Sequence, residues 1–301
     1  MIKKPKILVV GSSNMDMVIQ TGHFPKPGET IIGGEFSLIP GGKGANQAVA
    51  AARLGGDVSF VSQIGKDVFG DSSLENFIKE GIDISYVRQN PEQSTGVALI
   101  TVDESGENTI IVAPGANHHI SKEDIGRAEK VFAEAKVILV QLEIPMEIVK
   151  ACLSLAKKLG KNAILNPAPA ADLGGEILEG LFLITPNETE AEQLTGISIL
   201  DEASARTAAT ALISKGVENV IITLGASGAY CHSKDFQGIL PTQKVKAVDS
   251  TAAGDTFNGA LAVALGNKHS MEEAVRFALK AATLSVQKMG AQSSIPYLKD
   301  L

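Results

Sequence analysis

The sequence predicts an α/β protein with a doubly wound, mainly parallel sheet, helices on both faces, and a small inserted β-sheet placed to act as a lid. Short apolar runs alternate with helical patterns along most of the 301 residues. Such runs are typical of parallel strands that are buried on both faces. The alternation is broken in two places, and each break contains segments that we expect to be extended.

The apolar runs predict the strands of the main sheet, and the patterns between them predict its helices. The predicted strands span residues 7–11, 58–62, 137–142, 163–166, 181–185 and 220–224. The predicted helices span residues 45–54, 71–79, 122–135, 146–159 and 203–215.

The two breaks in the alternation predict the small sheet. Residues 15–38 form two extended pieces around F-P-K-P-G-E-T. Residues 94–114 contain T-G-V-A-L-I-T-V-D, then E-S-G-E, then N-T-I-I-V-A-P, which is a hairpin pattern around a polar turn with Gly106. We therefore expect the lid strands within about residues 14–38 and 86–114.

Composition and charge exclude several classes of function. The net charge is −7, Trp is absent and 4% of residues are aromatic, whereas nucleic-acid binders need a basic face or stacking surfaces. The apolar run 7–10 is too short for a signal sequence, and no run approaches a membrane span. Cys152 and Cys231 lie far apart in apolar segments, which indicates buried free thiols. We expect a cytoplasmic protein without nucleic-acid or membrane partners.

The stretch P-G-G-K-G-A-N-Q-A, residues 40–48, is a candidate sugar site. It is not a P-loop, because Gly44 stands where a Ser or Thr would bind magnesium. Its glycines allow close approach to a ligand. Lys43, Asn46 and Gln47 lie on the opening turn of an alanine-rich helix, where they offer donors and acceptors to a polyol. The alternative is a glycine-rich turn with solvated polar residues.

Two further stretches follow predicted strands, which is where open α/β sheets bind ligands. In G-S-S-N-M-D, residues 11–16, Asn14 and Asp16 are placed to bind sugar hydroxyls, although a capping role for Asp16 is an equal alternative. The turn T-L-G-A-S-G, residues 223–228, lets the backbone pass close to a nucleotide, but a single G-x-x-G is weak evidence.

The stretch T-P-N-E-T-E, residues 185–190, has two readings. Asn187 and Glu190 have the spacing of a helix capping box. The functional alternative places Asn187 near a phosphate and Glu190 near a magnesium-bound water.

The strongest candidate is V-D-S-T-A-A-G-D-T-F-N-G-A, residues 248–260. Ala252, Ala253 and Gly254 carry little bulk, so their N–H groups can meet a phosphate at a helix N-terminus. Asp255 lies in the same first turn, where it can accept the proton of an attacking hydroxyl during phosphoryl transfer. The alternative for Asp255 is a helix-stabilising first-turn aspartate.

The stretches G-G-K-G-A-N-Q-A and D-S-T-A-A-G-D-T-F-N-G-A resemble the two signatures of the ribokinase-like carbohydrate kinases. Q-L-E at 141–143, L-N-P-A-P-A at 165–170 and I-T-P-N-E-T-E-A-E at 184–192 add to the resemblance. It covers essentially the whole chain and implies one kinase domain over residues 1–301. It also implies ATP-dependent phosphorylation of D-ribose at its 5-hydroxyl, with Mg²⁺ and a monovalent activator, usually K⁺.

The resemblance further implies a role for each matching residue. The base is Asp255, and the anion hole uses the amides of Ala252, Ala253 and Gly254. The sugar-binding residues are Asn14, Asp16, Gly42, Lys43, Asn46 and Glu143. The nucleotide-binding residues are Asn187, Thr223, Gly225, Ser227, Gly228, Gly254 and Leu279. The metal-binding residues are Glu190 for Mg²⁺ through water and, for K⁺, Asp249, Thr251, Ser285, Lys288, Gly290 and Ser294.

Several alternatives stay open at this level. Leu279 stands where relatives often have Asn or His near adenine, which removes a polar contact to the base. The acceptor could instead be 2-deoxyribose, another pentose or a nucleoside. A non-catalytic sugar- or nucleotide-binding protein would have no need of Asp255, and an oxidoreductase would need the G-x-G-x-x-G that is missing after a strand. The resemblance also implies a homodimer through the lid sheets, which would cover their edge strands.

Overall fold

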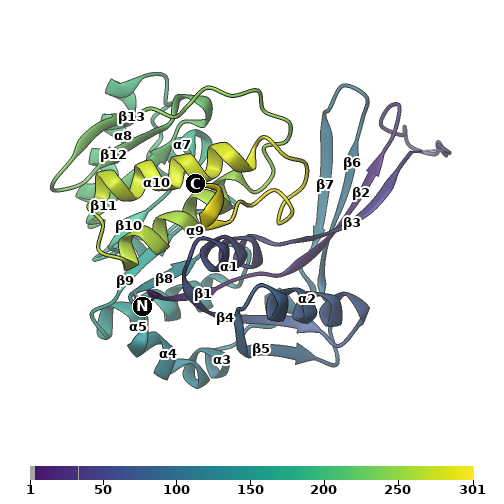
Figure 1. Cartoon of the computed structure of the whole chain (residues 1–301), viewed down its shortest axis with the longest axis horizontal. Coiled ribbons are helices and arrows are strands. Elements are labelled where there is room, and N and C mark those ends of the chain that lie inside the picture. Colours follow the sequence, from purple (N-terminus) through teal and green to yellow (C-terminus); the bar gives the residue numbers. More distant parts are fainter. Residues whose placement is uncertain (1–3, 33) are drawn as a thin grey trace.

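A nine-stranded sheet runs through the body of the protein in the computed structural model, which describes residues 4–32 and 34–301 (Figure 1). Its strands are β1 (Lys6–Val10), β4 (Asp57–Gly65), β5 (Asp83–Asn90), β8 (Val137–Val140), β9 (Asn162–Leu165), β10 (Leu183–Ile184), β11 (Asn219–Thr223), β12 (Ala229–His232) and β13 (Gln237–Leu240). Their order is β13-β12-β11-β10-β9-β8-β1-β4-β5. Neighbouring strands are parallel from β11 through to β5. The pairs β11–β12 and β12–β13 are antiparallel. The predicted mainly parallel sheet is confirmed.

Both faces of this sheet are apolar and covered by helices. Successive side chains of a strand point to opposite faces, so Leu8 and Val10 join one buried cluster while Ile7 and Val9 join the other. The first cluster packs against α3 (Lys122–Arg127), α4 (Glu129–Glu134), α5 (Met146–Lys158), α6 (Gly175–Leu178), α7 (Glu188–Thr195) and α8 (Glu202–Ser214). The second packs against α1 (Lys43–Arg53), α2 (Val68–Lys79), α9 (Ala253–Gly266) and α10 (Met271–Ser285). This double covering is the doubly wound fold.

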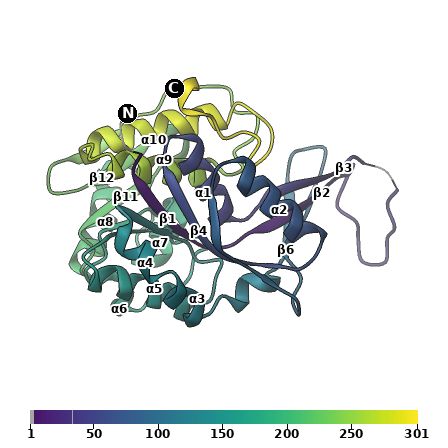
Figure 2. The same cartoon turned by 60° about the horizontal axis from the view of Figure 1, so that its bottom comes forward.

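A separate four-stranded sheet stands away from the body beyond α1 and α2 (Figures 1 and 2). Its strands are β2 (Asn14–Gln20), β3 (Phe36–Gly41), β6 (Gly96–Val102) and β7 (Asn108–Ala113), in the order β3-β2-β6-β7. The expected hairpin is present, because β6 and β7 pair antiparallel on either side of a turn in which Gly106 has φ 84°. We call these four strands the small sheet. The range expected for the small sheet includes Gly33, which lies outside the described residues.

Two expectations about individual elements were wrong. The segment from residue 86 to 90 belongs to β5, which pairs with β4 at the edge of the main sheet and not with the small sheet. All residues of β5 are half-buried or exposed, unlike those of a buried central strand such as β8, so its own sequence does not assign it to the main sheet. The helix expected over 122–135 is two short helices that meet at Ala128, whose amide is shared between the carbonyls of Asp124 and Ile125.

The state of the two cysteines agrees with the sequence. Cys152 and Cys231 are free and buried, as predicted. Within residues 4–32 and 34–301, none of the helices has both the length and the apolar character that crossing a membrane requires.

The glycines of the predicted sugar stretch bring backbone against backbone. A Cβ on Gly44 would lie 2.5 Å from the Ser12 nitrogen, and one on Gly42, where φ is 89°, would lie 2.7 Å from the Asn14 nitrogen. The sequence predicts that these glycines allow close approach to a ligand. Their observed effect is to seat the start of α1 directly on the chain that leaves β1, so that residues from both elements face the same space.

Candidate active site

A cavity of about 220 Å³ lies at the carboxyl ends of β9, β10 and β11. Asn166, Thr185 and Thr223 line it from the ends of these strands, at the edge where parallel sheets bind ligands. The other lining residues come from α1, α7, α9, the loops before α7 and α9, and the loop after β9: Lys43, Ala168, Asn187, Glu190, Ser250, Ala252, Ala253, Gly254, Asp255 and Asn258. The structure thus brings both signature stretches together in one place.

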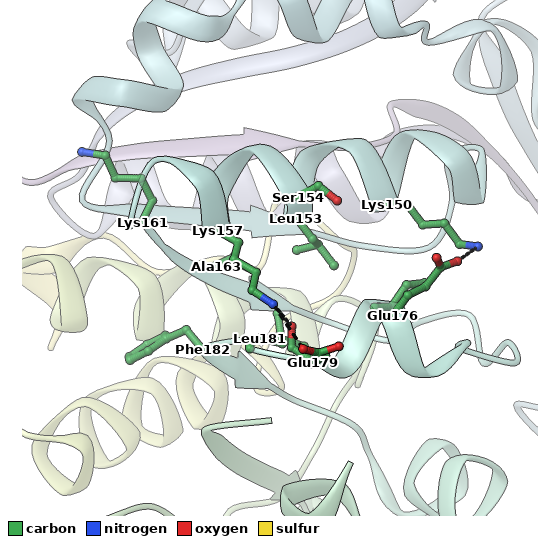
Figure 3. Close-up of a pocket in the computed structure, with 12 residues that line it drawn as sticks. Lys150, Leu153, Ser154, Lys157, Lys161, Ala163, Glu176, Glu179, Leu181 and Phe182 are labelled. Carbon is green, nitrogen blue, oxygen red and sulfur yellow. Dashed lines mark hydrogen bonds and ion pairs between the residues drawn. The ribbon is translucent and has the colours of Figure 1, made fainter. Parts of the chain in front are cut away.

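A second hollow lies at the opposite ends of β9 and β10, between α5 and α6 (Figure 3). Lys150, Lys157 and Lys161 line it, which would favour an anion. However, Lys150 pairs with Glu176, and Lys157 lies 3.8 Å from Glu179. These pairs neutralise two of the three lysines, so this hollow is a poor rival for the phosphate site.

The Asp255 carboxylate is held by two side-chain amides of α1. Asn46 Nδ2 donates to its Oδ2 at 3.0 Å, and Gln47 Nε2 donates to its Oδ1 at 2.9 Å. Asp255 is 7% exposed, Asn46 5% and Gln47 fully buried. Because a buried carboxylate needs hydrogen-bond donors, this pair of amides orients Asp255 toward the cavity.

A chain of buried amides supports this pair. Gln47 Nε2 also donates to Asn166 Oδ1 at 2.9 Å, and Gln141 Nε2 donates to Gln47 Oε1 at 2.5 Å. On the other side, Thr185 donates to Asn258 at 2.7 Å, whose amide donates to the Gly254 carbonyl at 2.8 Å. These supporting residues were not among the predicted site residues.

A signal in the sequence was available for some of them. Asn166 and Thr185 each directly follow a buried strand, so the rule that ligands meet strand ends points to both. Gln141 also follows a strand, but no spacing along the chain indicates that it bonds to Gln47.

The N-terminus of α9 is open to an anion. Side chains cap α2, α3, α7, α8 and α10, whereas no described side chain caps α9, and the same holds for α1, α4, α5 and α6. The residue before α9, Ala252, has φ 58° and is one of two non-glycine residues with positive φ in the described chain. A strained, uncapped start of this kind leaves first-turn N–H groups for a ligand.

One of the expected anion-hole amides has a protein partner. The Ala253 N–H donates to the Ser250 carbonyl at 3.2 Å. To bind phosphate, Ala253 would have to release this bond, while the Gly254 and Asp255 amides follow it in the same first turn.

Lys43 supplies positive charge beside the acids of the site. Burial lowers the pKa of Lys43, but the carboxylates of Asp255, Glu143 and Glu190 outweigh that effect and raise it above the ordinary value. Lys43 therefore stays protonated, and its charge offsets theirs in the cavity.

Three predicted sugar-binding residues lie where the small sheet meets the body. Glu143 accepts hydrogen bonds from the Lys43 amide at 2.9 Å and from the Ser12 hydroxyl. Asn14 opens β2 and is 4% exposed. Asp16 lies on the same face of β2, and a Cβ on Gly41 would be 2.2 Å from its carboxylate. The backbone thus approaches Asp16 closely, and no helix begins there for it to cap.

The predicted capping box at Asn187 and Glu190 is present. Asn187 Oδ1 accepts from the Glu190 amide at 2.8 Å, and Glu190 Oε2 accepts from the Asn187 amide at 2.9 Å. Both residues also line the cavity. Burial raises the pKa of Glu190, while the Asn187 amide and Lys43 oppose that effect. Capping is therefore compatible with the expected functional role, because each side chain keeps a second polar atom.

The predicted nucleotide residues form two neighbouring groups. Thr223 makes a parallel bridge to Asn187 and precedes η2 (Gly225–Ser227), the turn between β11 and β12. A Cβ on Gly228, where φ is 102°, would lie 2.9 Å from the Cα of Pro241. Pro241 and Leu279 line a separate hollow beside α10. Leu279 therefore does not line the cavity at Asp255 but lies next to the turn that leads from it.

The predicted cation residues come from two loops that the structure joins. The amides of Val248 and Asp249 both donate to the Val286 carbonyl, at 2.7 and 3.2 Å. Asp249 accepts from the Thr251 amide and hydroxyl at 2.8 and 2.6 Å and from the Gly290 amide at 2.8 Å. Partial burial would raise the pKa of Asp249, but these bonds lower it below the ordinary value.

The comparisons with known proteins agree with this geometry. A family model described as "pfkB family carbohydrate kinase" matches residues 4–298. The chain belongs to this family. Its similarity to curated relatives extends over nearly the full length of both chains. A ribokinase of Haemophilus influenzae is 48% identical over 290 residues, 96% of this chain and 95% of its own. A deoxyribokinase of Salmonella typhi is 38% identical over 294 residues, 97% of this chain and 96% of its own.

A solved structure of a pfkB-like fold gives the same result in three dimensions. The structure of an Arabidopsis thaliana ribokinase complexed with ribose and ATP has a TM-score of 0.90 at 33% identity, covering 99% of this chain and 97% of that one. As a member of the pfkB family of carbohydrate kinases, the protein is a phosphotransferase that acts on a sugar hydroxyl.

The buried carboxyl group of Asp16 makes the stability of this kinase depend on pH. Burial, with Glu143 and Asp255 nearby, raises the pKa of Asp16 from 3.8 to about 7. A carboxyl group with a higher pKa in the folded protein destabilises the fold above both values and has no effect below both. The stability of the wild type should therefore fall as pH rises from about 4 to 7.

We predict that Asp16→Asn stabilises the ligand-free protein at pH 8. The gain should reach as much as about 4 kcal/mol and vanish near pH 4, because a shift of one pKa unit corresponds to about 1.36 kcal/mol. Urea denaturation across this pH range measures it. Asp103→Asn is the contrast: hydrogen bonds from the Ser105 hydroxyl and the Glu107 and Ser105 amides lower the pKa of Asp103. That variant should lose stability at neutral pH, and equal behaviour of the two variants would contradict the prediction.

Proposed function

We propose that this protein is an ATP-dependent kinase that phosphorylates D-ribose at its 5-hydroxyl to give ribose 5-phosphate in the cytoplasm. The observation that carries the proposal is the Asp255 carboxylate, held by Asn46 and Gln47 at the uncapped N-terminus of α9. A base and an anion site are thereby adjacent, as phosphoryl transfer requires. The 48% identity to a ribokinase supports ribose as the acceptor.

The sugar would bind between the small sheet and the body. Asn14 and Asp16 come from β2, Asn46 and Lys43 from α1, and Glu143 from the loop after β8. Gly42, immediately before α1, completes the predicted set of sugar residues. Carboxylates and amides in this number can bind most of the hydroxyls of a pentose, and the small sheet would act as the lid that excludes water.

In the reaction, the proton of the 5-hydroxyl moves to Asp255 while that oxygen forms a bond to the γ-phosphorus of ATP. The bond between this phosphorus and the bridging oxygen breaks, and ADP leaves. Charge develops on the transferring phosphoryl oxygens, which the amides of residues 252–254 would stabilise. The nucleotide would extend past Asn187 and Thr223 toward the turn at Gly225, Ser227 and Gly228, with its base near Leu279.

The donor set fits a divalent cation that is held mostly by phosphates and water. Within the described residues there is no cluster of three or more acidic, His or Cys side chains able to hold a metal, and Mg²⁺ commonly relies on substrate phosphates and waters. Glu190 would bind one such water through the carboxylate oxygen that its cap leaves over. When bound, Mg²⁺ neutralises charge on the phosphates.

The loops at Asp249 and Gly290 fit a monovalent cation, because they combine one carboxylate with several carbonyls. The expected oxygen donors are those of Asp249, Thr251, Ser285, Lys288, Gly290 and Ser294. Ser294 is buried, and its hydroxyl donates to the Ala291 carbonyl, which turns its lone pairs away from that partner. A bound K⁺ would add positive charge close to the start of α9.

A second acceptor, 2-deoxyribose, is favoured by one observation, the 38% identity to a deoxyribokinase. The phosphate-handling residues serve either sugar, so they do not discriminate between the two. The preference between ribose and 2-deoxyribose depends on the hydrogen bonds that the protein makes to the 2-hydroxyl of ribose.

The central experiment measures ATP consumption with ribose, 2-deoxyribose, fructose and adenosine, for the wild type and for Asp255→Asn. We expect the highest kcat/KM with ribose, and a loss of at least about a hundredfold in kcat for Asp255→Asn, since general bases contribute about 10² to 10⁴. ATP binding and the fold should be retained.

Asp235→Asn, an exposed aspartate in the turn before β13, is the matched control and should keep wild-type turnover. Turnover of Asp255→Asn within about tenfold of the wild type would remove Asp255 as the base. Higher kcat/KM with another acceptor would replace ribose as the substrate.

Exchange of cations tests the loops at Asp249 and Gly290. With K⁺ replaced by a large organic cation at constant ionic strength, ribose-dependent turnover should fall severalfold, because the positive charge near α9 is lost. Equal turnover in both salts would remove Asp249 and Ser294 from the site.

We also propose a homodimer through the small sheet. Met17 pairs with Leu38 and Leu99, and Leu99 pairs with Ile111, so these residues form a row across all four strands. Leu38, Leu99 and Ile111 are 49%, 51% and 70% exposed. Because side chains alternate along β2, this row lies on the face opposite Asp16. An exposed apolar row of this kind is typical of an interface between subunits.

Sedimentation velocity tests this interface. The wild type should sediment as a dimer and Leu99→Lys as a monomer, since the introduced charge would be buried between two apolar faces. Leu200→Lys, at a residue that is 88% exposed outside the small sheet, should remain dimeric. A Leu99→Lys dimer would place the interface elsewhere.

A further inference from the structure

We propose that Asn117 is a positioning residue that determines which end of the Asn14 amide faces the acceptor sugar. The inference rests on the proposed function, in which Asn14 binds that sugar. Asn117 was not among the residues predicted from the sequence. It lies in η1 (Gly115–His119), directly after β7, and is 1% exposed.

Asn117 bonds to the chain at the base of β2 through both ends of its amide. Its Oδ1 accepts from the Ser13 backbone N–H at 2.8 Å. Its Nδ2 donates to Asn14 Oδ1 at 2.7 Å and to the Ser13 carbonyl at 3.2 Å. All of these bonds are buried.

These bonds fix which end of each side-chain amide is the donor and which is the acceptor, starting from the backbone N–H of Ser13. The Ser13 N–H can only donate, so the Asn117 atom that faces it must be the oxygen, and the other end must be the NH₂ group. That NH₂ group can only donate, so the Asn14 atom that faces it must also be an oxygen. The remaining end of Asn14, its own NH₂ group, is then the end left for the sugar.

The packing around these amides leaves little room for another arrangement. A Cβ on Gly96, the first residue of β6, would lie 2.2 Å from Asn14 Oδ1 and 2.3 Å from Asn117 Nδ2. Gly96 also pairs with Asn14 in the small sheet. The starts of β2 and β6 and the turn after β7 therefore meet at this pair of amides, which is the place where the small sheet joins the body.

By the same reasoning, the end of the Asn46 amide that is left for the sugar is its oxygen, the opposite of Asn14. Its Nδ2 donates to Asp255 Oδ2, and its buried Oδ1 has no hydrogen-bond partner among the described residues. The site therefore offers a donor from Asn14 and an acceptor from Asn46. A sugar that lacks the oxygen facing Asn14 would leave a buried N–H unpaired, which penalises that sugar.

Asn117→Asp tests the inference with a change of one atom. The new carboxylate still accepts from Ser13, but its second oxygen repels Asn14 Oδ1, so the Asn14 amide should turn over and present its oxygen to the sugar. We expect ribose binding, measured by calorimetry without nucleotide, to weaken about tenfold or more, in line with the cost of an unpaired buried donor or acceptor. The KM for ribose should rise accordingly, and the KM for ATP should stay as in the wild type.

The Asn14→Ala background separates positioning from a general structural effect. If Asn117 acts through Asn14, Asn117→Asp should weaken ribose binding by less than about twofold in that background, because the coupling partner is gone. Equal weakening in both backgrounds, or none in the wild type, would overturn the proposal. A wild type that binds no ribose would contradict the proposed function instead, so the two failures are distinguishable.

Gly96→Ala provides the test if Asn117→Asp does not fold. Its methyl group would push the two amides apart without removing a polar atom, so ribose binding should weaken while Asn14 is present. Gly126→Ala, in α3 with open space around it, is the matched control and should bind ribose as the wild type does. Wild-type ribose binding by Gly96→Ala would overturn the proposal.

Discussion

The buried carboxylate of Asp255 is the constraint on which the rest of the site depends. A carboxylate removed from water is costly unless donors satisfy it, and here Asn46 and Gln47 donate to one oxygen each. Both amides lie on the first turn of α1, which must therefore lie directly against the start of α9. The glycines at the start of α1 make this possible, because they allow that turn to rest on the chain leaving β1. The sugar stretch and the phosphate stretch are thus one structural unit.

The charges around this unit favour function over stability. Asp255, Glu143 and Glu190 act on Lys43, and burial together with Glu143 and Asp255 raises the pKa of Asp16 to about 7. Hydroxyl groups of a bound sugar would donate to these carboxylates and relieve the cost. In the ligand-free protein that cost remains, which is the usual relation between an arranged site and the stability of its fold.

Local patterns predicted the elements whose cause is local. Residues 7–10 are apolar throughout because both faces of β1 are covered, and the hairpin around Gly106 follows from its turn. β5 was misplaced because only its pairing with β4, and no feature of its own sequence, distinguishes this edge strand from a strand of the small sheet. The bonds from Asn117 to Ser13 and from Gln141 to Gln47 join residues about 100 positions apart. No periodicity or spacing encodes such pairs, so these two pairings emerge only from the fold.

The direction of hydrogen bonds connects these distant pairs to specificity. A carboxamide has a donor end and an acceptor end of nearly the same shape, so it has no preferred orientation of its own. Backbone groups cannot exchange their roles, and the Ser13 N–H therefore sets the orientation of Asn117 and, through it, that of Asn14. Ser13 lies at the end of the body and Asn14 begins the small sheet. If Asn14 binds the sugar as proposed, the polarity offered to that sugar depends on how the small sheet is seated on the body, and a displacement of the base of this sheet would change what the site can recognise.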